Sequence, residues 1–283
     1  MSKFKSLIFE NYQVFNSPIP LARDSKIGDG NISQVSARNN SNCEYIKIPS
    51  FLNLPENNLA IRRVGNISYA VYPGMCDKTQ FLSNYLELCF PYTLSGVSYD
   101  LNYNWLVEMY HLMSLDHIKS THFLTLRGFS VDEVVEANQN SSISEMIYKV
   151  SLPDSLVLFK DKTPTIKKSL VSLTLFSAFT VGMQININSN WSFLILFNVL
   201  PTGVKSHRLF VDFYSSKKLN PLFLLDPLLK LVSWVTIMED LEYLKVLSKG
   251  SIFGNAGNAK KENVPLENNW LIKRFKFLYL SNI

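Results

Sequence analysis

The sequence predicts an α+β protein in which an antiparallel β-sheet packs against a long C-terminal helix. β-Branched and aromatic residues form several short runs between residues 144 and 214, and Asn, Pro, Gly and Lys separate these runs. A helical pattern of apolar residues then extends over residues 222–249. The 283 residues are 47% apolar and 13% aromatic, which is sufficient for a sizeable core.

The first part of the chain predicts a small β segment. Residues 6–49 are polar and rich in turn signals, among them Pro18, Pro20 and the glycine-bearing stretch 26–31. Residues 60–72 predict two further strands that meet in a turn at Gly65-Asn66.

The first strong helical pattern covers residues 102–122, where Trp105, Met109 and Leu112 recur at three- and four-residue steps. Gly250 is expected to end the long helix, and a shorter helix is expected over residues 270–280. Between the two long helical patterns we expect strands over residues 144–152, 155–159, 169–187, 191–200 and 207–214, and after the second a polar loop over 254–263.

Composition argues against several classes of protein. The net charge of +5 is mild and the basic residues are scattered, so no nucleic-acid-binding patch is expected. Cys43, Cys76 and Cys89 form no CxxC pair, which favours reduced thiols and a cytoplasmic protein. The apolar tracts 169–183 and 222–238 are too short or carry charges, and the N-terminal apolar run is too short for a signal peptide, so we expect no membrane span.

Two histidines, His117 and His122, lie in one segment with four residues between them, although the chain has only four histidines. Residues five apart on a straight α-helix are separated by about 140°, so a shared metal requires that the helix end, tighten or carry a π-bulge between them. The alternative is one partly buried and one solvated histidine. His111 and His207 have no matching spacing, and His207 is expected in a solvated hairpin loop.

Asp240 lies on the apolar stripe of the long helix, beside Ile237 and Leu244 at three- and four-residue steps. A carboxylate on a core-facing stripe needs a cation, a hydrogen-bond network or a raised pKa. A metal would meet that need, and so would an arginine or the phenol of a tyrosine. Two imidazoles and one carboxylate form the ligand set of mononuclear non-haem Fe(II) sites with open positions. The opposite, solvated stripe is expected to hold Glu239, Glu242, Lys245 and Lys249.

The segment from Asn104-Trp105 to His122 resembles the helix of Rieske-type non-haem iron oxygenase large subunits, particularly the vanillate demethylase and pheophorbide a oxygenase branch. That helix carries Asn-Trp near its start and His-x4-His at its end. Glu239-Asp240 with Leu244 is similar to the family's third-ligand segment, and residues 269–274 are similar to its closing helix. The resemblance implies that His117, His122 and Asp240 hold a mononuclear Fe(II).

The resemblance also implies the domain organisation: a truncated Rieske-like β domain over residues 1–49 and a helix-grip, START-like catalytic domain over residues 50–283. Family members commonly form trimers. Here the four positions that align with the family's cluster ligands lack cysteine and histidine, and a Rieske centre requires two of each, so no 2Fe–2S cluster is expected in this chain. These four positions are Val14, Asn16, Ser33 and Ser36.

Two further positions differ from the family pattern. Ser114 replaces the carboxylate that lies three residues before the first iron histidine, and His111 replaces an asparagine. Asp116 points about 100° away from His117 on a regular helix, so it is not expected to substitute for the missing carboxylate. Electron transfer by the family's usual route is therefore not expected.

Two functions follow. The first is an Fe(II) oxygenase component that hydroxylates or oxidatively demethylates an apolar or aromatic small molecule. Residues 169–214 would wall its substrate pocket, and a separate iron–sulfur or flavin protein would supply electrons to a homo-trimer or mixed assembly. The second is a non-catalytic ligand-binding or assembly subunit derived from such an oxygenase. The retained ligand triad favours the enzyme, and the lost cluster ligands favour the second function.

Overall fold

The computed structural model describes residues 17–23, 60–71, 78–122, 124–126, 129–139, 143–151, 168–188, 190–203, 205–219, 222–249 and 269–280. The strand expected over residues 155–159, the loop expected over 254–263 and Gly250 lie outside these ranges. The four aligned cluster positions, Val14, Asn16, Ser33 and Ser36, also lie outside them.

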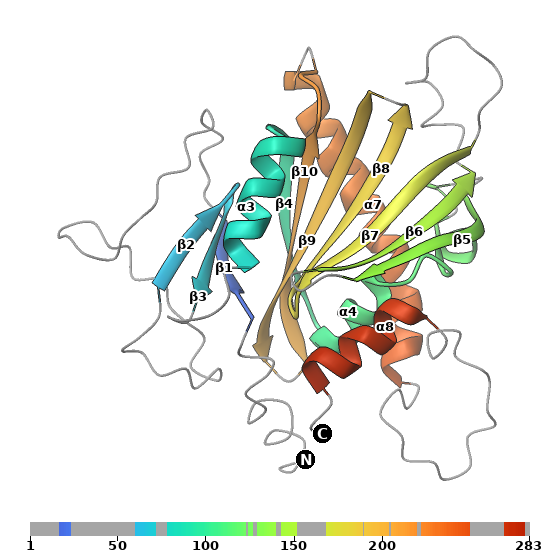
Figure 1. Cartoon of the computed structure of the whole chain (residues 1–283). Coiled ribbons are helices and arrows are strands. Elements are labelled where there is room, and N and C mark those ends of the chain that lie inside the picture. The colour runs from blue at the N-terminus through green and yellow to red at the C-terminus, as the bar shows by residue number, and fades with distance from the viewer. Residues whose placement is uncertain are drawn as a thin grey trace.

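A sheet of seven antiparallel strands forms the centre of the molecule, in the order β4-β10-β9-β8-β7-β6-β5 (Figure 1). Most of the buried apolar side chains belong to this sheet and to the helices packed on it. Its strands are β4 (Tyr92–Leu101), β5 (Ser130–Gln139), β6 (Ser144–Ser151), β7 (Lys168–Ser177), β8 (Thr180–Asn188), β9 (Trp191–Gly203) and β10 (Ser206–Ser215).

The long helix α7 (Leu222–Lys249) packs against the sheet, as the sequence predicts. Figure 1 shows α7 behind the sheet and α3 (Lys78–Cys89) in front of it. On β4, the Ser95 hydroxyl donates to Asp226 Oδ1 at 2.7 Å and the Tyr99 hydroxyl to Ser233 Oγ at 3.1 Å. The expected α+β class with a sheet on a long C-terminal helix is therefore confirmed. Within the described ranges no helix combines the length and apolarity needed to cross a bilayer.

Several elements differ from the expectation. The run 169–187 is not one strand but the hairpin β7–β8, which turns at Ala178-Phe179 without a Gly, Pro or Asn to signal the turn. Strand β5 was not predicted. It lies at the edge of the sheet, and its residues 132–138 are exposed, so they show no alternation of apolar and polar residues. The helix α3 and the strand β4 were also not predicted from their patterns.

A second, three-stranded sheet has the order β1-β3-β2, formed by β1 (Ile19–Arg23), β2 (Ala60–Val64) and β3 (Ile67–Val71). Gly65 adopts φ +58° in the predicted turn between β2 and β3, a conformation that favours glycine. Since β1 pairs with β3, this sheet contains residues from both sides of the domain boundary expected at residue 49. Arg23 on β1 forms an ion pair with Asp212 on β10, at 2.7 Å, which joins the small sheet to the large one.

The helix expected over residues 102–122 is interrupted. Helix α4 (Trp105–Leu112) begins after Asn104, whose side chain accepts a hydrogen bond from Leu106 N, and α5 (Ile118–Thr121) is a single turn. At the chain's end, α8 (Trp270–Phe275) continues into the π-helix η4 (Lys276–Leu280). Asn269 at the start of α8 donates from Nδ2 to the Met113 carbonyl at 3.0 Å, directly at the interruption.

Candidate metal centre

His117 and His122 flank the single turn α5. His117 is its N-cap and His122 its C-cap, so the backbone leaves the helix at the second histidine with φ −94° and ψ 73°. The two rings consequently lie close together, with centroids 5.4 Å apart, although a regular helix would turn them apart. Both side chains are buried. The predicted irregularity is therefore present, and the alternative of one solvated histidine is not what the structure shows.

Asp240 faces the core from α7 and is only 6% exposed, as its place on the apolar stripe predicts. Its Oδ1 atom lies 3.0 Å from His122 Nε2, 3.1 Å from His111 Nε2 and 3.7 Å from His117 Nε2. Three imidazoles thus face one carboxylate oxygen, and we call these four residues the Asp240 cluster. Among the described residues, the ionisable side chains that contact Asp240 are imidazoles rather than an arginine.

His111 was not predicted as part of a site, yet the described residues whose ligand atoms lie mutually close enough to hold a metal are His111, His117 and Asp240, without the predicted His122. One possible ligand atom from each of His111, His117 and Asp240 lies within 4.8 Å of the others. The spacing of His111 and His117 gave no signal because α4 ends between them. The structure shows that every residue of α4 from Trp105 to His111 is buried, so the imidazole in this segment must face other protein groups, which the sequence spacing did not reveal.

Glu239 supports His122 from outside the cluster. Its Oε2 atom lies 3.3 Å from His122 Nδ1, while Leu124 N donates to Oε1 at 2.5 Å and the Thr125 hydroxyl donates to Oε2 at 2.6 Å. The expectation that Glu239 belongs to a solvated stripe is therefore wrong. The chain after His122 comes back over α7 and covers this carboxylate, which a helical-wheel pattern alone does not reveal.

A second buried carboxylate, Glu108, lies behind His111. It accepts a hydrogen bond from the Tyr103 hydroxyl, and its oxygens lie 4.0 Å from His111 Nδ1 and 3.7 Å from His207 Nε2. His207 has no exposed surface, and its Nδ1 lies 3.0 Å from the Tyr103 carbonyl. The expectation of a solvated His207 is therefore wrong, because His207 lies within β10 and pairs with Leu101 of β4 instead of belonging to the hairpin loop.

Burial and mutual charge set the protonation of the cluster. Burial favours the neutral form of Asp240, but His111 and His122 outweigh it and lower the pKa of this carboxyl. Burial also opposes protonation of His111, yet Asp240 and Glu108 raise the pKa of this imidazole. For His117, burial and the neighbouring His111 lower the pKa to about 2, so this ring is neutral. A neutral imidazole and an ionised carboxylate are the forms that bind metals.

Ser114 and Asp116 lie beside the cluster. The Ser114 backbone forms a hydrogen bond with His117 that raises the pKa of that imidazole, against the larger effect of burial. The buried Ser114 hydroxyl lies 3.3 Å from Asp116 Oδ2, and Asp116 itself is exposed. Neither residue therefore places a carboxylate against the histidines.

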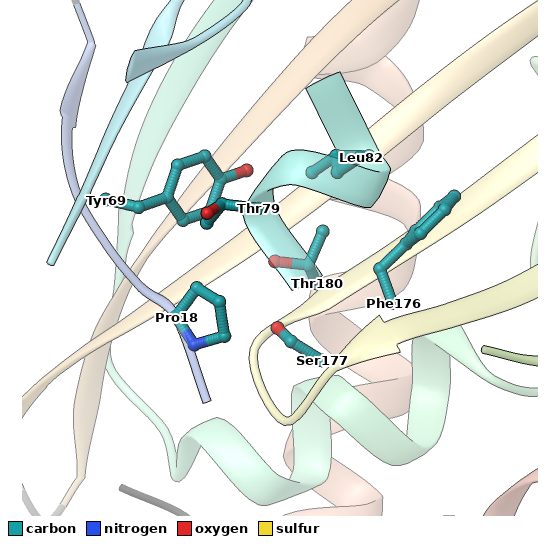
Figure 2. Close-up of a pocket in the computed structure, with 7 residues that line it drawn as sticks. All are labelled: Pro18, Tyr69, Thr79, Leu82, Phe176, Ser177 and Thr180. Carbon is teal, nitrogen blue, oxygen red and sulfur yellow. The ribbon is translucent and has the colours of Figure 1, made fainter. Parts of the chain in front are cut away.

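A small hollow lies at the junction of the two sheets, away from the Asp240 cluster. Figure 2 shows around it Pro18, which directly precedes β1, and side chains from β3, α3 and the β7–β8 hairpin. Phe176, Ser177 and Thr180 of the run 169–214 line this hollow, but no residue of the Asp240 cluster does, so it is not the pocket beside the metal that the sequence predicts. The lining residues are Pro18, Tyr69, Thr79, Leu82, Phe176, Ser177 and Thr180.

Comparisons with known proteins find likeness only at the level of structure. No family model matches the sequence, and no curated protein matches it. Dicamba monooxygenase bound to 3,6-dichlorosalicylic acid superposes with a TM-score of 0.59 at 12% identity, over 79% of this chain and 70% of that chain. The shared property is the fold. Dicamba monooxygenase bound to dicamba gives 0.57 over the same shares.

A quaternary ammonium Rieske monooxygenase that has been studied for carnitine oxidation matches with a TM-score of 0.48 at 14% identity. The match covers 68% of this chain and 52% of that chain, so the present chain spans about half its length. At these identities, the comparisons establish the architecture of the chain and leave its activity open.

Proposed function

We propose that this chain is a component of a non-haem iron oxygenase and holds Fe(II) with His117, His122 and Asp240. The observation that carries the proposal is the convergence of buried imidazoles on one buried carboxylate oxygen, from segments far apart in the sequence. Such a donor set suits a divalent first-row metal, and two histidines with one carboxylate are typical of Fe(II) sites that activate dioxygen.

The chain's own residues have defined roles in this proposal. Asp240 supplies the charged oxygen ligand, and the neutral His117 supplies a nitrogen ligand without the need to lose a proton. Glu239 fixes the orientation of His122 through its Nδ1 atom, as outer carboxylates do for metal-binding histidines. When bound, Fe(II) would supply the dioxygen chemistry at positions that the protein leaves free.

For the reaction we propose hydroxylation or oxidative demethylation of an apolar or aromatic small molecule. The fold supports this substrate class, because dicamba monooxygenase, bound to dicamba and to 3,6-dichlorosalicylic acid, shares it. Residues 1–49 would be a shortened Rieske-like domain and residues 50–283 the catalytic domain. Since the aligned positions Val14, Asn16, Ser33 and Ser36 lack cluster ligands, electrons would come from a separate iron–sulfur or flavin protein. An oligomer, either a homo-trimer or a mixed assembly, is part of the proposal.

The second candidate function is a non-catalytic ligand-binding or assembly subunit. Ser114 favours it, because the family's electron-bridging carboxylate would stand at this position. The contact of His111 with Asp240 also favours it, since a protonated His111 neutralises the carboxylate without a metal.

Anaerobic reconstitution with Fe(II) tests the proposal. We expect stoichiometric iron in the wild-type chain, loss of iron in His117→Ala, and unchanged iron in the control Asp116→Asn, which alters the exposed neighbour. Single-turnover oxidation of methoxylated aromatic acids with a chemical reductant then distinguishes the two functions. Product formation supports the oxygenase, iron without product supports the non-catalytic subunit, and absence of iron refutes the metal site.

A further inference from the structure

We propose that His111 is an additional ligand of this metal and that Glu108 is the residue that positions it. The inference rests on the proposed function and deepens it, because the site would then use three imidazoles and one carboxylate. At position 111 the family pattern has an asparagine, and the histidine in this chain would raise the number of protein ligands from three to four.

The first support is the distance between ligand atoms. Metal–nitrogen and metal–oxygen bonds are about 2.0–2.2 Å long, so ligand atoms on one ion lie about 3–4 Å apart. Those of His111, His117 and Asp240 all lie within 4.8 Å of one another, which is close to that range before any metal contracts the group. The rings of His111 and His117 have centroids 4.0 Å apart, closer than those of His117 and His122.

The second support is a common arrangement of the three histidines. Each one directs Nε2 at Asp240 Oδ1, and each has a separate group on its other side. For His122 this group is the Glu239 carboxylate, and for His117 it is the Ser114 backbone. For His111 the neighbouring group is Glu108, whose Oε1 lies 4.0 Å from Nδ1, a distance that a small ring movement would have to shorten to give a hydrogen bond. Metal-binding histidines typically have such an outer partner, which fixes the tautomer and the ring orientation.

The third support is the environment of Glu108. This carboxylate is 2% exposed, the Tyr103 hydroxyl donates a hydrogen bond to it, and His207 Nε2 lies 3.7 Å from its Oε2. The Nδ1 atom of His111 is itself buried and has no hydrogen-bond partner among the described residues. A buried carboxylate fixed next to an unpartnered imidazole nitrogen is a costly arrangement for a core that serves only packing. As the outer partner of a metal ligand, Glu108 has a function that accounts for its place.

A fourth protein ligand changes what the metal can bind. A six-coordinate ion with two histidines and one carboxylate keeps three positions for other ligands, and a third histidine leaves two. The site would therefore hold the metal more tightly and accept one exogenous ligand fewer.

Counting the imidazoles on the bound metal tests this inference without any measurement of turnover. The chain is loaded anaerobically with Co(II), and X-ray absorption fine structure gives the number of coordinated imidazoles. We expect three in the wild type and two in His111→Ala. His111→Gln keeps most of the side-chain volume and serves where the alanine variant does not fold. The control is Glu242→Gln, which changes an exposed carboxylate on the same helix as Asp240, and it should retain three imidazoles.

Affinity tests the positioning role of Glu108. Glu108→Gln should keep three imidazoles but weaken Co(II) binding about tenfold, as loss of an outer carboxylate usually does. His111→Ala should weaken binding more than this. Two imidazoles in the wild type, with unchanged or tighter binding in the His111 variants, would show that His111 is only a counter-ion and would overturn the inference while the proposed iron site stands. Absence of bound metal from every variant and the wild type would refute both.

Discussion

Asp212 and Asp240 are both buried carboxylates, but their surroundings differ in kind. Asp212 lies in β10 with no exposed surface and is paired with the Arg23 guanidinium at 2.7 Å. Asp240 lies in α7 and is surrounded by the imidazoles of the Asp240 cluster. Each carboxylate joins segments that are distant in the sequence. Burial alone therefore does not distinguish a carboxylate in a structural ion pair from one that we propose as a metal ligand.

The two sites differ in whether the groups beside the carboxylate can lose a proton and bind a metal in its place. An arginine keeps its proton throughout the physiological range and offers no lone pair, so the Arg23–Asp212 pair cannot take up a metal. An imidazole exchanges its proton for a metal near neutral pH. The surrounding backbone is also adapted to the arginine, since a Cβ atom at Gly96 would lie 2.3 Å from Arg23 Nη1. The Arg23–Asp212 pair therefore serves only as a structural ion pair, whereas the imidazoles of the Asp240 cluster can exchange a proton for a metal ion.

The largest expected effect is on metal content. Asp240→Asn removes the charged ligand, so bound iron should fall from stoichiometric to background, whereas Asp212→Asn should retain it. Iron is measured in anaerobically reconstituted protein whose folded state is verified by circular dichroism. Equal iron content in the two variants would contradict the proposal that Asp240, and not Asp212, is a metal ligand.

The second effect is on stability. Arg23→Met leaves Asp212 buried without its counter-charge, and we expect the free energy of unfolding to fall by about 3–5 kcal/mol. The control is Arg208→Met, which breaks the exposed ion pair with Asp100 and should cost no more than about 1 kcal/mol. Urea unfolding followed by fluorescence measures both variants, and similar losses would contradict a structural role for the buried pair.

The third effect is the pH dependence of that stability. Burial raises the pKa of Asp212 to about 6 against the opposing effect of Arg23, whereas an unfolded aspartate has a pKa of 3.8. Between these values the folded chain holds a proton that the unfolded chain has lost, so this contribution to stability is present below pH 3.8 and is lost as the pH rises through 6. It should amount to about 3 kcal/mol and be absent from Asp212→Asn in parallel urea titrations. A wild type and variant with the same pH profile would contradict it.

The smallest effect concerns the outer partner of His122. Glu239→Gln should weaken Fe(II) binding about tenfold, because His122 loses the carboxylate that orients its ring. Glu242→Gln changes an exposed carboxylate on the same helix and should leave the affinity unchanged. Competition with a chelator gives both affinities, and an equal loss in the two variants would indicate a general effect of charge on α7.

The sequence alone determined those features that depend on local pattern. Alternation and turn residues located most strands of the large sheet, and three- and four-residue periodicity located α7 over its full length. The same periodicity placed Asp240 on the buried side of that helix. For a shared metal, the spacing of His117 and His122 required an irregular helix between them, and α5 does end at His122. Their role as iron ligands stays a prediction.

Only the tertiary structure determined the groups around those residues. His111 joins the Asp240 cluster because α4 ends after Leu112, and Glu239 is covered because the chain beyond His122 returns over α7. His207 and Glu108 meet because β10 pairs with β4 beside α4. Each of these contacts joins segments that are distant in the sequence. The periodicity of a helix or strand determines which side of that element a residue occupies, but it does not determine which other element packs against that side.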